Sequence, residues 1–247
     1  KYKMITLRNK GKGIVFIEVN NPPVNALSLS LVQKLNKTLE LKVIMDASVL
    51  VFYSKGKGFS AGADLKERSA MSKEESLTTV DSYCSLFNKI ESLNCPTISR
   101  IHGYALGGGL ELSLACDFRF ATEDTLLGFP ETNIGIIPGA GGTQRLPRLI
   151  GLGKAKEWIF LAQKFSAKKG LEDKVLNAVF DSEEDMDKYV EKFCANISDN
   201  CNIAISAAKK SINAFNDITN GPDIERKEYA KTFDSEVRRK NLERYKK

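Results

Sequence analysis

No apolar run in this 247-residue sequence is long enough to cross a membrane as a helix, so we expect no membrane partner. His102 is the only histidine, which excludes a metal site built from several histidines. The five cysteines are odd in number and show no CxxC spacing, which argues against a disulfide framework or a zinc site and indicates a reducing compartment. There is no GxxxxGK[ST] motif, and "GKGFSAG" misses the GxGxxG spacing by one residue, so no nucleotide site is predicted.

The composition fits a globular chain with a core of its own. Hydrophobic residues make up 42% and charged residues 28%, and the length fits one large domain or one domain with an appendage. The net charge of +6 suits an anionic ligand, although a lysine-rich surface without a partner has the same balance. The first ten residues, "KYKMITLRNK", do not have the pattern of a signal peptide.

Strand and helix patterns alternate along much of the chain. "MITLRN" and "GIVFIEVN" are apolar runs joined by "KGKG", which predicts a β-hairpin. Alternation continues from about residue 48 and predicts βαβ units in an α/β fold, whereas the sequence from Gly151 onward is almost all helical in pattern. The expected strands are 48–54, 97–103, 118–122 and 126–129, and the expected helices include 29–41 and 73–92.

One motif is typical of serine hydrolases. "GFSAG", at 58–62, fits GxSxG, with Ser60 as the nucleophile, His102 as the base, and Asp64 or Asp81 as the acid. However, "KGKG" separates the strand from Ser60, whereas a nucleophile elbow turns sharply off its strand. We therefore interpret the motif as a glycine-rich turn with an incidental serine.

Two similar junctions carry a different chemistry. "FSAGADLKE" and "GYALGGGLEL" each place small residues where a strand ends and a helix begins, so their backbone N–H groups are open to close approach. Two converging amides form an oxyanion hole, which stabilises charge on a carbonyl oxygen. Glu111 lies in an apolar segment beside one junction, and Glu131 precedes a Gly/Pro loop. Taken singly, Glu111 could be a salt-bridged core residue and Glu131 a capping residue, but together they indicate acid–base chemistry next to a carbonyl.

Six segments extend this pattern over nearly the whole chain: "NPPVNALS", "SAGADLKE", "GYALGGGLEL", "CDFRFAT", "PETNIGIIPGAGGTQRLPRLIG" and "ISAAKKSIN". In order and spacing they resemble the enoyl-CoA hydratase/isomerase (crotonase) family. The resemblance implies an α/β, crotonase-like spiral of βαβ units in residues 1–190, which hold the active site. It also implies a C-terminal helical trimerisation region in residues 191–247, and acyl-CoA thioesters as ligands.

Carried over residue by residue, the resemblance implies roles for individual positions. The oxyanion-hole amides fall at Ala63 and Gly108, and the catalytic pair falls at Glu111 and Glu131. Substrate and CoA contacts fall at Val24, Ala26, Ala61, Asp64, Leu65 and Gly107.

The implied activity is syn addition of water across the double bond of a 2-enoyl-CoA thioester. No metal or redox cofactor is needed, and coenzyme A is part of the substrate. Family members that lack one carboxylate do other work, so the alternative is an enoyl-CoA delta-isomerase or another acyl-CoA activity. A non-catalytic CoA-binding protein is a less favoured interpretation.

"ADLKERSAMS" is most similar to the mitochondrial branch that includes the AU-rich-RNA-binding methylglutaconyl-CoA hydratase. Of the lysines on that enzyme's first helix, only Lys37 falls in register here, with Lys34 displaced by one, so RNA binding is not carried over. Arg68 is the candidate cation for an acyl chain with a second carboxylate. The resemblance implies fatty-acid or branched-chain amino-acid degradation, in the mitochondrial matrix of a eukaryote or the cytoplasm of a bacterium.

The resemblance also implies a homotrimer or a dimer of trimers. The apolar residues of the C-terminal part support this expectation, because one helical layer would leave them exposed in a monomer. They are Trp158, Ile159, Phe160, Leu161, Ile203, Ile205, Ala207, Ala208, Ile212 and Phe215.

Overall fold

The computed structural model describes residues 3–215, 217, 219–233 and 235–243. Within these residues the main sheet has six strands in the order β1-β2-β3-β4-β6-β9, and a second sheet has three in the order β5-β7-β8. β1 is antiparallel to β2, and the other pairs of the main sheet are parallel. The strands are β1 (Ile5–Asn9), β2 (Ile14–Val19), β3 (Val49–Ser54), β4 (Thr97–Ile101), β5 (Tyr104–Leu106), β6 (Phe118–Thr122), β7 (Leu126–Gly128), β8 (Lys164–Ser166) and β9 (Ala178–Phe180).

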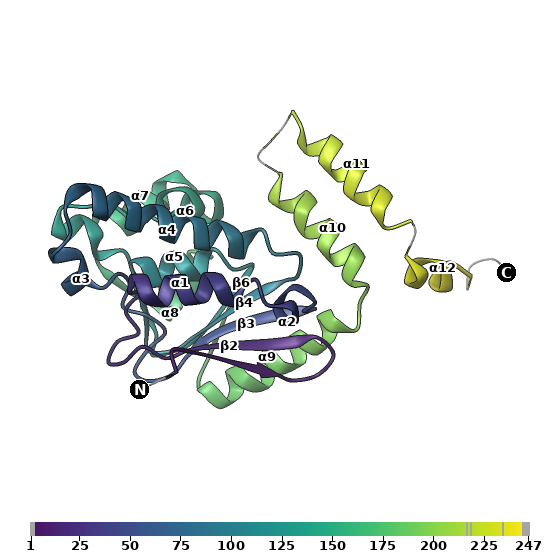
Figure 1. The fold of residues 1–247 in the computed structure, drawn as a ribbon, viewed down its shortest axis with the longest axis horizontal. Coiled ribbons are helices and arrows are strands. Elements are labelled where there is room, and N and C mark those ends of the chain that lie inside the picture. Colours follow the sequence, from purple (N-terminus) through teal and green to yellow (C-terminus); the bar gives the residue numbers. More distant parts are fainter. Residues whose placement is uncertain (1–2, 216, 218, 234, 244–247) are drawn as a thin grey trace.

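Helices cover both faces of the main sheet (Figure 1). They are α1 (Leu29–Thr38), α2 (Lys42–Met45), α3 (Leu65–Ser69), α4 (Lys73–Glu91), α5 (Gly108–Leu114), the 3-10 helix η1 (Pro130–Ile134), α6 (Gly142–Ile150), α7 (Leu152–Phe160), α8 (Ala167–Glu172), α9 (Glu183–Ser198), α10 (Asn202–Asn213), α11 (Gly221–Lys231) and α12 (Glu236–Glu243). Among the helices of the described residues, none combines the length and apolar character of a membrane span.

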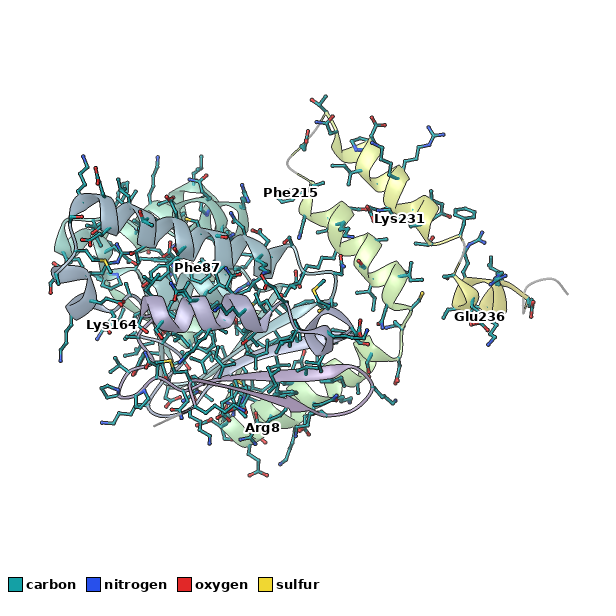
Figure 2. All side chains as sticks on the ribbon, viewed as in Figure 1. Arg8, Phe87, Lys164, Phe215, Lys231 and Glu236 are labelled. Atoms are coloured by element: carbon teal, nitrogen blue, oxygen red, sulfur yellow. The ribbon has the colours of Figure 1, made fainter. Side chains whose placement is uncertain are left out.

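The alternation of side chains along each strand divides the core in two. In β3, Leu50 and Phe52 pack in the larger cluster with residues of α1 and α4, whereas Val49 and Val51 pack against α9. Figure 2 shows side chains filling the layer around Phe87 of α4. Parallel strands with both faces covered have nearly continuous apolar sequences, which is why "VLVF" in β3 shows no polar alternation.

The predicted hairpin, the strands of the main sheet up to β6 and helices α1 and α4 are confirmed. The expectation of an almost wholly helical region after Gly151 was wrong at two places. β8 pairs with β7, and β9 adds an edge strand beside β6. Each has three residues, too few to give a strand periodicity in the sequence. β5, between β4 and α5, was missed for the same reason.

The last helices extend away from the sheet body (Figure 1). α10 is held to the body by Lys209, whose Nζ donates to the Cys95 carbonyl at 3.0 Å and to Asp117 Oδ2 at 2.7 Å. Phe215, labelled in Figure 2, is 64% exposed on this part of the chain. The expected boundary between residues 190 and 191 falls inside α9, and the division into two regions stays a prediction. The last residues of the expected C-terminal region, 244–247, lie outside the described residues.

Candidate active site

The two predicted junctions lie side by side. One runs from β3 to α3 through Ala63, and the other from β5 to α5 through Gly108. A parallel bridge pairs Ser60 with Ala105, and another pairs Leu27 with Ala63. The backbone of three chain segments therefore meets at one place, beside the start of α5.

The amides of Ala63 and Gly108 lie within a few ångströms of each other. A Cβ atom at Gly62 would lie 3.0 Å from the Gly108 nitrogen, and one at Gly108 would lie 3.5 Å from the Ala63 nitrogen. The positive φ of +90° at Gly62 further favours glycine there. In the part of the chain that the structure describes, neither amide donates to a protein acceptor. Two such N–H groups match the arrangement that binds a developing oxyanion.

Glu111 lies on α5 and is 3% exposed. Its Oε1 accepts hydrogen bonds from the backbone N–H groups of Ala140 and Gly142, each at 2.8 Å. Burial raises the pKa of the Glu111 carboxyl, and the two N–H groups and the positive charges of Arg145 and Arg68 oppose that rise. Two hydrogen bonds to one oxygen therefore offset part of the free-energy cost of burying this carboxylate, and they fix its orientation.

Glu131 lies in η1 and its carboxyl packs against Gly107, where a Cβ atom would lie 2.6 Å from Glu131 Oε1. Its Oε2 is buried and has no hydrogen-bond partner among the described residues. Burial, with a smaller contribution from the nearby charge of Glu111, raises the pKa of Glu131 to about 7. Near neutral pH, Glu131 therefore exists in both the neutral and the ionised form.

The predicted substrate contacts are Val24, Ala26, Ala61, Asp64, Leu65 and Gly107. Five of them lie along the first junction, because the Ala61 N–H donates to the Val24 carbonyl at 3.0 Å and aligns the two segments. Leu65 is 58% exposed and Val24 38%. The Asp64 side chain caps α3, since its Oδ1 accepts from the backbone N–H groups of Lys66 and Glu67. Gly107 lies at the second junction against Glu131.

Arg68 and Tyr83 lie beside the paired junctions. The Tyr83 hydroxyl donates to the carbonyl of Leu27, the residue that bridges Ala63. The Arg68 guanidinium lies 5.5 Å from the Tyr83 ring centroid, and its charge lowers the pKa of Glu111. The Arg68 Nε is buried without a hydrogen-bond partner among the described residues. Arg68 therefore lies on the same side of the site as Glu111.

The structure does not support a catalytic Ser60. Its hydroxyl donates to the Asn25 carbonyl at 2.7 Å and accepts from the Gly62 N–H at 3.1 Å. His102 Nε2 lies 3.0 Å from the Gly56 carbonyl oxygen. No hydrogen bond joins Ser60 to His102 in the described residues, so the hydrolase alternative was rightly set aside.

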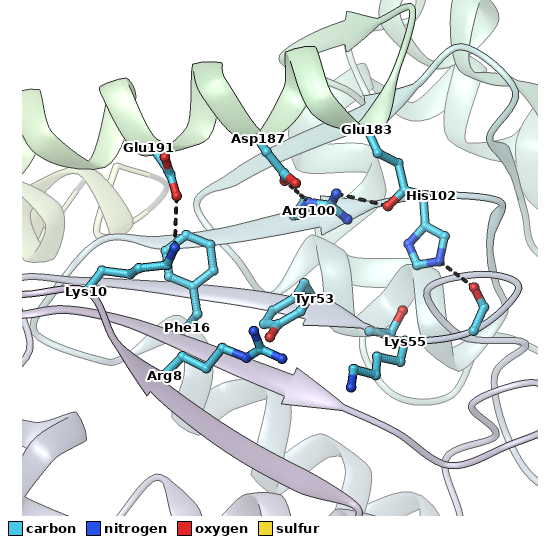
Figure 3. Close-up of a pocket in the computed structure, with 12 residues that line it drawn as sticks. Arg8, Lys10, Phe16, Tyr53, Lys55, Arg100, His102, Glu183, Asp187 and Glu191 are labelled. Carbon is cyan, nitrogen blue, oxygen red and sulfur yellow. Dashed lines mark hydrogen bonds and ion pairs between the residues drawn. The ribbon is translucent and has the colours of Figure 1, made fainter.

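His102 instead lines a charged cavity of about 400 Å³ between the main sheet and α9 (Figure 3). Two of its cations pair with acids of α9, since Lys10 contacts Glu191 at 3.0 Å and Arg100 contacts Glu183 at 2.9 Å. Arg8 and Lys55 instead pair with Glu18 of β2. This cavity lies on the opposite face of the sheet from Glu111 and Glu131. Ile98, on the same face of β4 as Arg100, packs against α9, whereas Ile101 packs in the larger cluster with residues of α5.

The loop at 138–142 was missed as part of the site. It supplies the two N–H groups that hold Glu111, and the sequence "PGAGG" marks a glycine-rich turn without showing which side chain it contacts. Among the described residues, no group of three or more His, Cys, Asp or Glu side chains is arranged to hold a metal.

Two amides without an acceptor among the described residues, beside two buried carboxylates, define a site for acid–base chemistry next to a carbonyl group. A sequence model described as enoyl-CoA hydratase/isomerase matches residues 9–247. The chain belongs to the enoyl-CoA hydratase/isomerase family, as its motifs predicted.

Relatives of known name agree with this assignment. Human mitochondrial methylglutaconyl-CoA hydratase is 37% identical over 244 residues, which are 96% of this chain and 72% of that protein. The enoyl-CoA isomerase/hydratase fer4 of Mycosarcoma maydis is 35% identical over 246 residues, 94% of this chain and 89% of that protein. The crystal structure of an enoyl-CoA hydratase from Bacillus anthracis matches with a TM-score of 0.92 at 36% identity, covering 99% of this chain and 96% of that chain. The predicted α/β crotonase fold is confirmed.

Proposed function

We propose that this protein hydrates 2-enoyl-CoA thioesters. The observation that carries the proposal is the pair of buried carboxylates, Glu111 and Glu131, next to the amides of Ala63 and Gly108, which donate to no acceptor in the described part of the chain. An isomerase moves one proton between two carbons and needs a single acid–base group, whereas addition of water has two proton transfers to manage. The second carboxylate therefore favours the hydratase over the isomerase.

In the proposed reaction, the two amides hold the thioester oxygen as it gains enolate charge. Each such donor is commonly worth about 10² to 10³ in rate. Glu111 takes a proton from water while the water oxygen bonds to the β-carbon. Glu131 gives its proton to the α-carbon, and the rise of its pKa to about 7 keeps the neutral donor available near neutral pH. The proton on Glu111 then returns to Glu131, directly or through water, and the net change is addition of one water molecule.

Arg68 supports a preference for acyl chains that carry a second carboxylate. Its guanidinium has no acidic partner among the described residues, although its Nη1 lies 3.5 Å from the Ser76 carbonyl. A half-buried cation without an acidic partner keeps part of its desolvation cost. An acyl chain with a terminal carboxylate would pair with it, and the likeness to methylglutaconyl-CoA hydratase is in keeping with such a substrate. In Arg68→Gln the preference for acidic over neutral enoyl-CoA should fall about tenfold or more, while Lys73→Gln, on exposed α4 surface, should leave it unchanged.

The protein is proposed to need no metal or redox cofactor. Coenzyme A is part of the substrate and is not a separate cofactor. The basic balance of +6 suits the phosphates of CoA. RNA is not proposed as a partner. The compartment is proposed to be the mitochondrial matrix in a eukaryote or the cytoplasm in a bacterium.

The proposed assembly is a homotrimer or a dimer of trimers. Trp158 and Ile159 are buried within the chain, but Phe160 is 70% exposed, Ile212 67% and Phe215 64%. A cavity of about 910 Å³ lies between α10 and the ends of α5 and α6, lined partly by Leu114, Leu149 and Ile212. Apolar surface of this kind is what a neighbouring subunit would cover.

The test is loss of the conjugated enoyl-thioester absorbance of crotonyl-CoA, without added metal or nucleotide. Wild type should turn over, and Glu111→Gln and Glu131→Gln should each lose several orders of magnitude while acyl-CoA binding persists. Glu123→Gln, an exposed glutamate in the turn after β6, is the matched control and should keep full activity. No turnover across C4 to C10 enoyl-CoAs, together with turnover of a 3-enoyl-CoA, would replace the hydratase with an isomerase.

A further inference from the structure

Arg145 connects the loop that holds Glu111 to a distant helix. It lies on α6 and is 7% exposed. Its Nε and Nη2 donate to Glu91 Oε2 at 3.0 and 2.8 Å, and Nη2 also donates to Asn88 Oδ1 at 2.7 Å. Glu91 and Asn88 belong to α4, so three hydrogen bonds fix the guanidinium in one orientation.

The remaining nitrogen of the fork points at the loop. Nη1 donates to the Ala140 carbonyl at 3.2 Å. That carbonyl lies between the two N–H groups, of Ala140 and Gly142, that donate to Glu111 Oε1. The fixed guanidinium therefore fixes the two donors of the carboxylate.

Gly141 shows how tightly the guanidinium packs on this turn. Its φ is +107°, and a Cβ atom there would lie 2.0 Å from Arg145 Nη1. A side chain at 141 would be strained by the backbone and would displace the guanidinium. The turn and the arginine thus fit each other, and the fit is independent of the contacts that hold Glu111.

We propose that Arg145 is a positioning residue for Glu111: by clamping the 140–142 turn to α4, it holds one carboxylate oxygen so that the other faces the attacking water. This inference rests on the proposed function, in which Glu111 activates that water. Glu111 Oε2 accepts no hydrogen bond from the described residues, which leaves it for this task. Supporting shells of this kind commonly change activity by about 10- to 100-fold when removed.

The positive charge of Arg145 also supports the proposed role of Glu111, because it favours the ionised carboxylate. Arg145 and Arg68 lower the pKa of Glu111, whereas burial raises it. The other titratable groups facing Glu111 are Glu131 of η1 and Cys84 of α4, whose pKa values are influenced by the Glu111 charge. Because Arg68 and these groups stay in place, a change at Arg145 alone should move the titration of Glu111 upward.

The experiment compares Arg145→Gln, Arg145→Lys and Glu91→Gln with wild type. We expect kcat to fall about 10- to 100-fold in Arg145→Gln with KM for the acyl-CoA within about threefold, and the acidic limb of the pH profile to move upward. Arg145→Lys keeps the charge without the fork and should recover part of kcat. Arg148→Gln, an exposed arginine on the same helix, is the matched control and should change neither quantity.

Glu91→Gln keeps Arg145 and removes only its ion pair, so it covers the case in which Arg145→Gln does not fold. It should lower kcat in the same direction, and the two changes together should cost less than the product of their separate effects, because they remove one clamp. Unchanged kcat and an unmoved acidic limb in the folded variants would overturn the proposal, as would an equal loss in Arg148→Gln.

A readout without turnover separates this inference from the proposed function. In protein carrying ¹³C-labelled glutamate carboxyls, with the Glu111 signal assigned by its loss in Glu111→Gln, the titration should move upward in Arg145→Gln and stay in place in Arg148→Gln. That shift in a protein that does not hydrate enoyl-CoA would uphold the clamp and refute the hydratase. Hydratase activity without the shift would do the reverse.

Discussion

Glu131→Gln should make the protein more stable at alkaline pH while it strongly lowers activity. In the fold, Glu131 Oε2 is buried without a partner among the described residues, and burial is the largest cause that raises its pKa to about 7. In the unfolded chain the same carboxyl ionises near its ordinary pKa of 4.5. The native state therefore binds the proton more tightly than the unfolded state, and the associated stability is present below pH 4.5 and lost as pH rises through 7.

The magnitude follows from the two pKa values. The gap between about 7 in the fold and 4.5 in the unfolded chain corresponds to about 3 kcal/mol of unfolding free energy at pH 8. Glutamine has similar size and never ionises, so the variant avoids this loss. In a chain of 247 residues, about 3 kcal/mol corresponds to a rise in Tm of roughly 6 to 12 °C.

The assay is urea unfolding of wild type and Glu131→Gln at pH 5 and pH 8. The two proteins should differ little at pH 5, and the variant should be more stable at pH 8, with Glu123→Gln unchanged at both. Hydration should fall by roughly 10² to 10⁴ in the same variant. A variant that is no more stable than wild type at pH 8 would refute the reasoning, because the carboxylate would then be solvated or partnered in the native state.

Three further predictions concern the pH dependence of catalysis, Ser60 and the assembly. Values of kcat/KM for hydration and for the reverse dehydration should share one pH dependence, because the overall reaction exchanges no net proton. Both values should fall above pH about 7 as Glu131 loses its proton, and opposite slopes for the two directions would contradict this prediction. Ser60→Ala removes hydrogen bonds to Asn25 and Gly62 and should cost about 1 to 2 kcal/mol of stability with activity nearly intact, whereas a folded, inactive variant would restore the nucleophile hypothesis. Light scattering at micromolar concentration should give three or six times 27.4 kDa, and a fully active monomer would refute the assembly alone.

The sequence predicted the junctions because their backbone requires particular residues. Gly62 has a positive φ, and a Cβ atom there would lie 3.0 Å from the Gly108 nitrogen, so the small residue has a geometric cause that a sequence motif can record. An apolar segment around Glu111 likewise predicted a buried carboxylate, and the residue is 3% exposed. Local constraints of this kind can be predicted from a short stretch of sequence.

Contacts between distant segments could not be predicted in the same way. Arg145 and Glu91 are 54 residues apart, and nothing in either helix specifies that they meet. β8 and β9 exist because β7 and β6 offer free edges, while their own three-residue sequences carry no periodic signal. The pKa of Glu131 depends on what buries it, which only the folded chain defines.

The most direct test of the central claim is mass spectrometry of the product formed from crotonyl-CoA in ¹⁸O-labelled water. Hydration by Glu111 and Glu131 predicts a hydroxyacyl-CoA that carries one ¹⁸O atom, formed by wild type and Glu123→Gln but not at a comparable rate by Glu111→Gln. A product of unchanged mass, with its double bond moved and no ¹⁸O, would contradict the account and establish an isomerase on the same site.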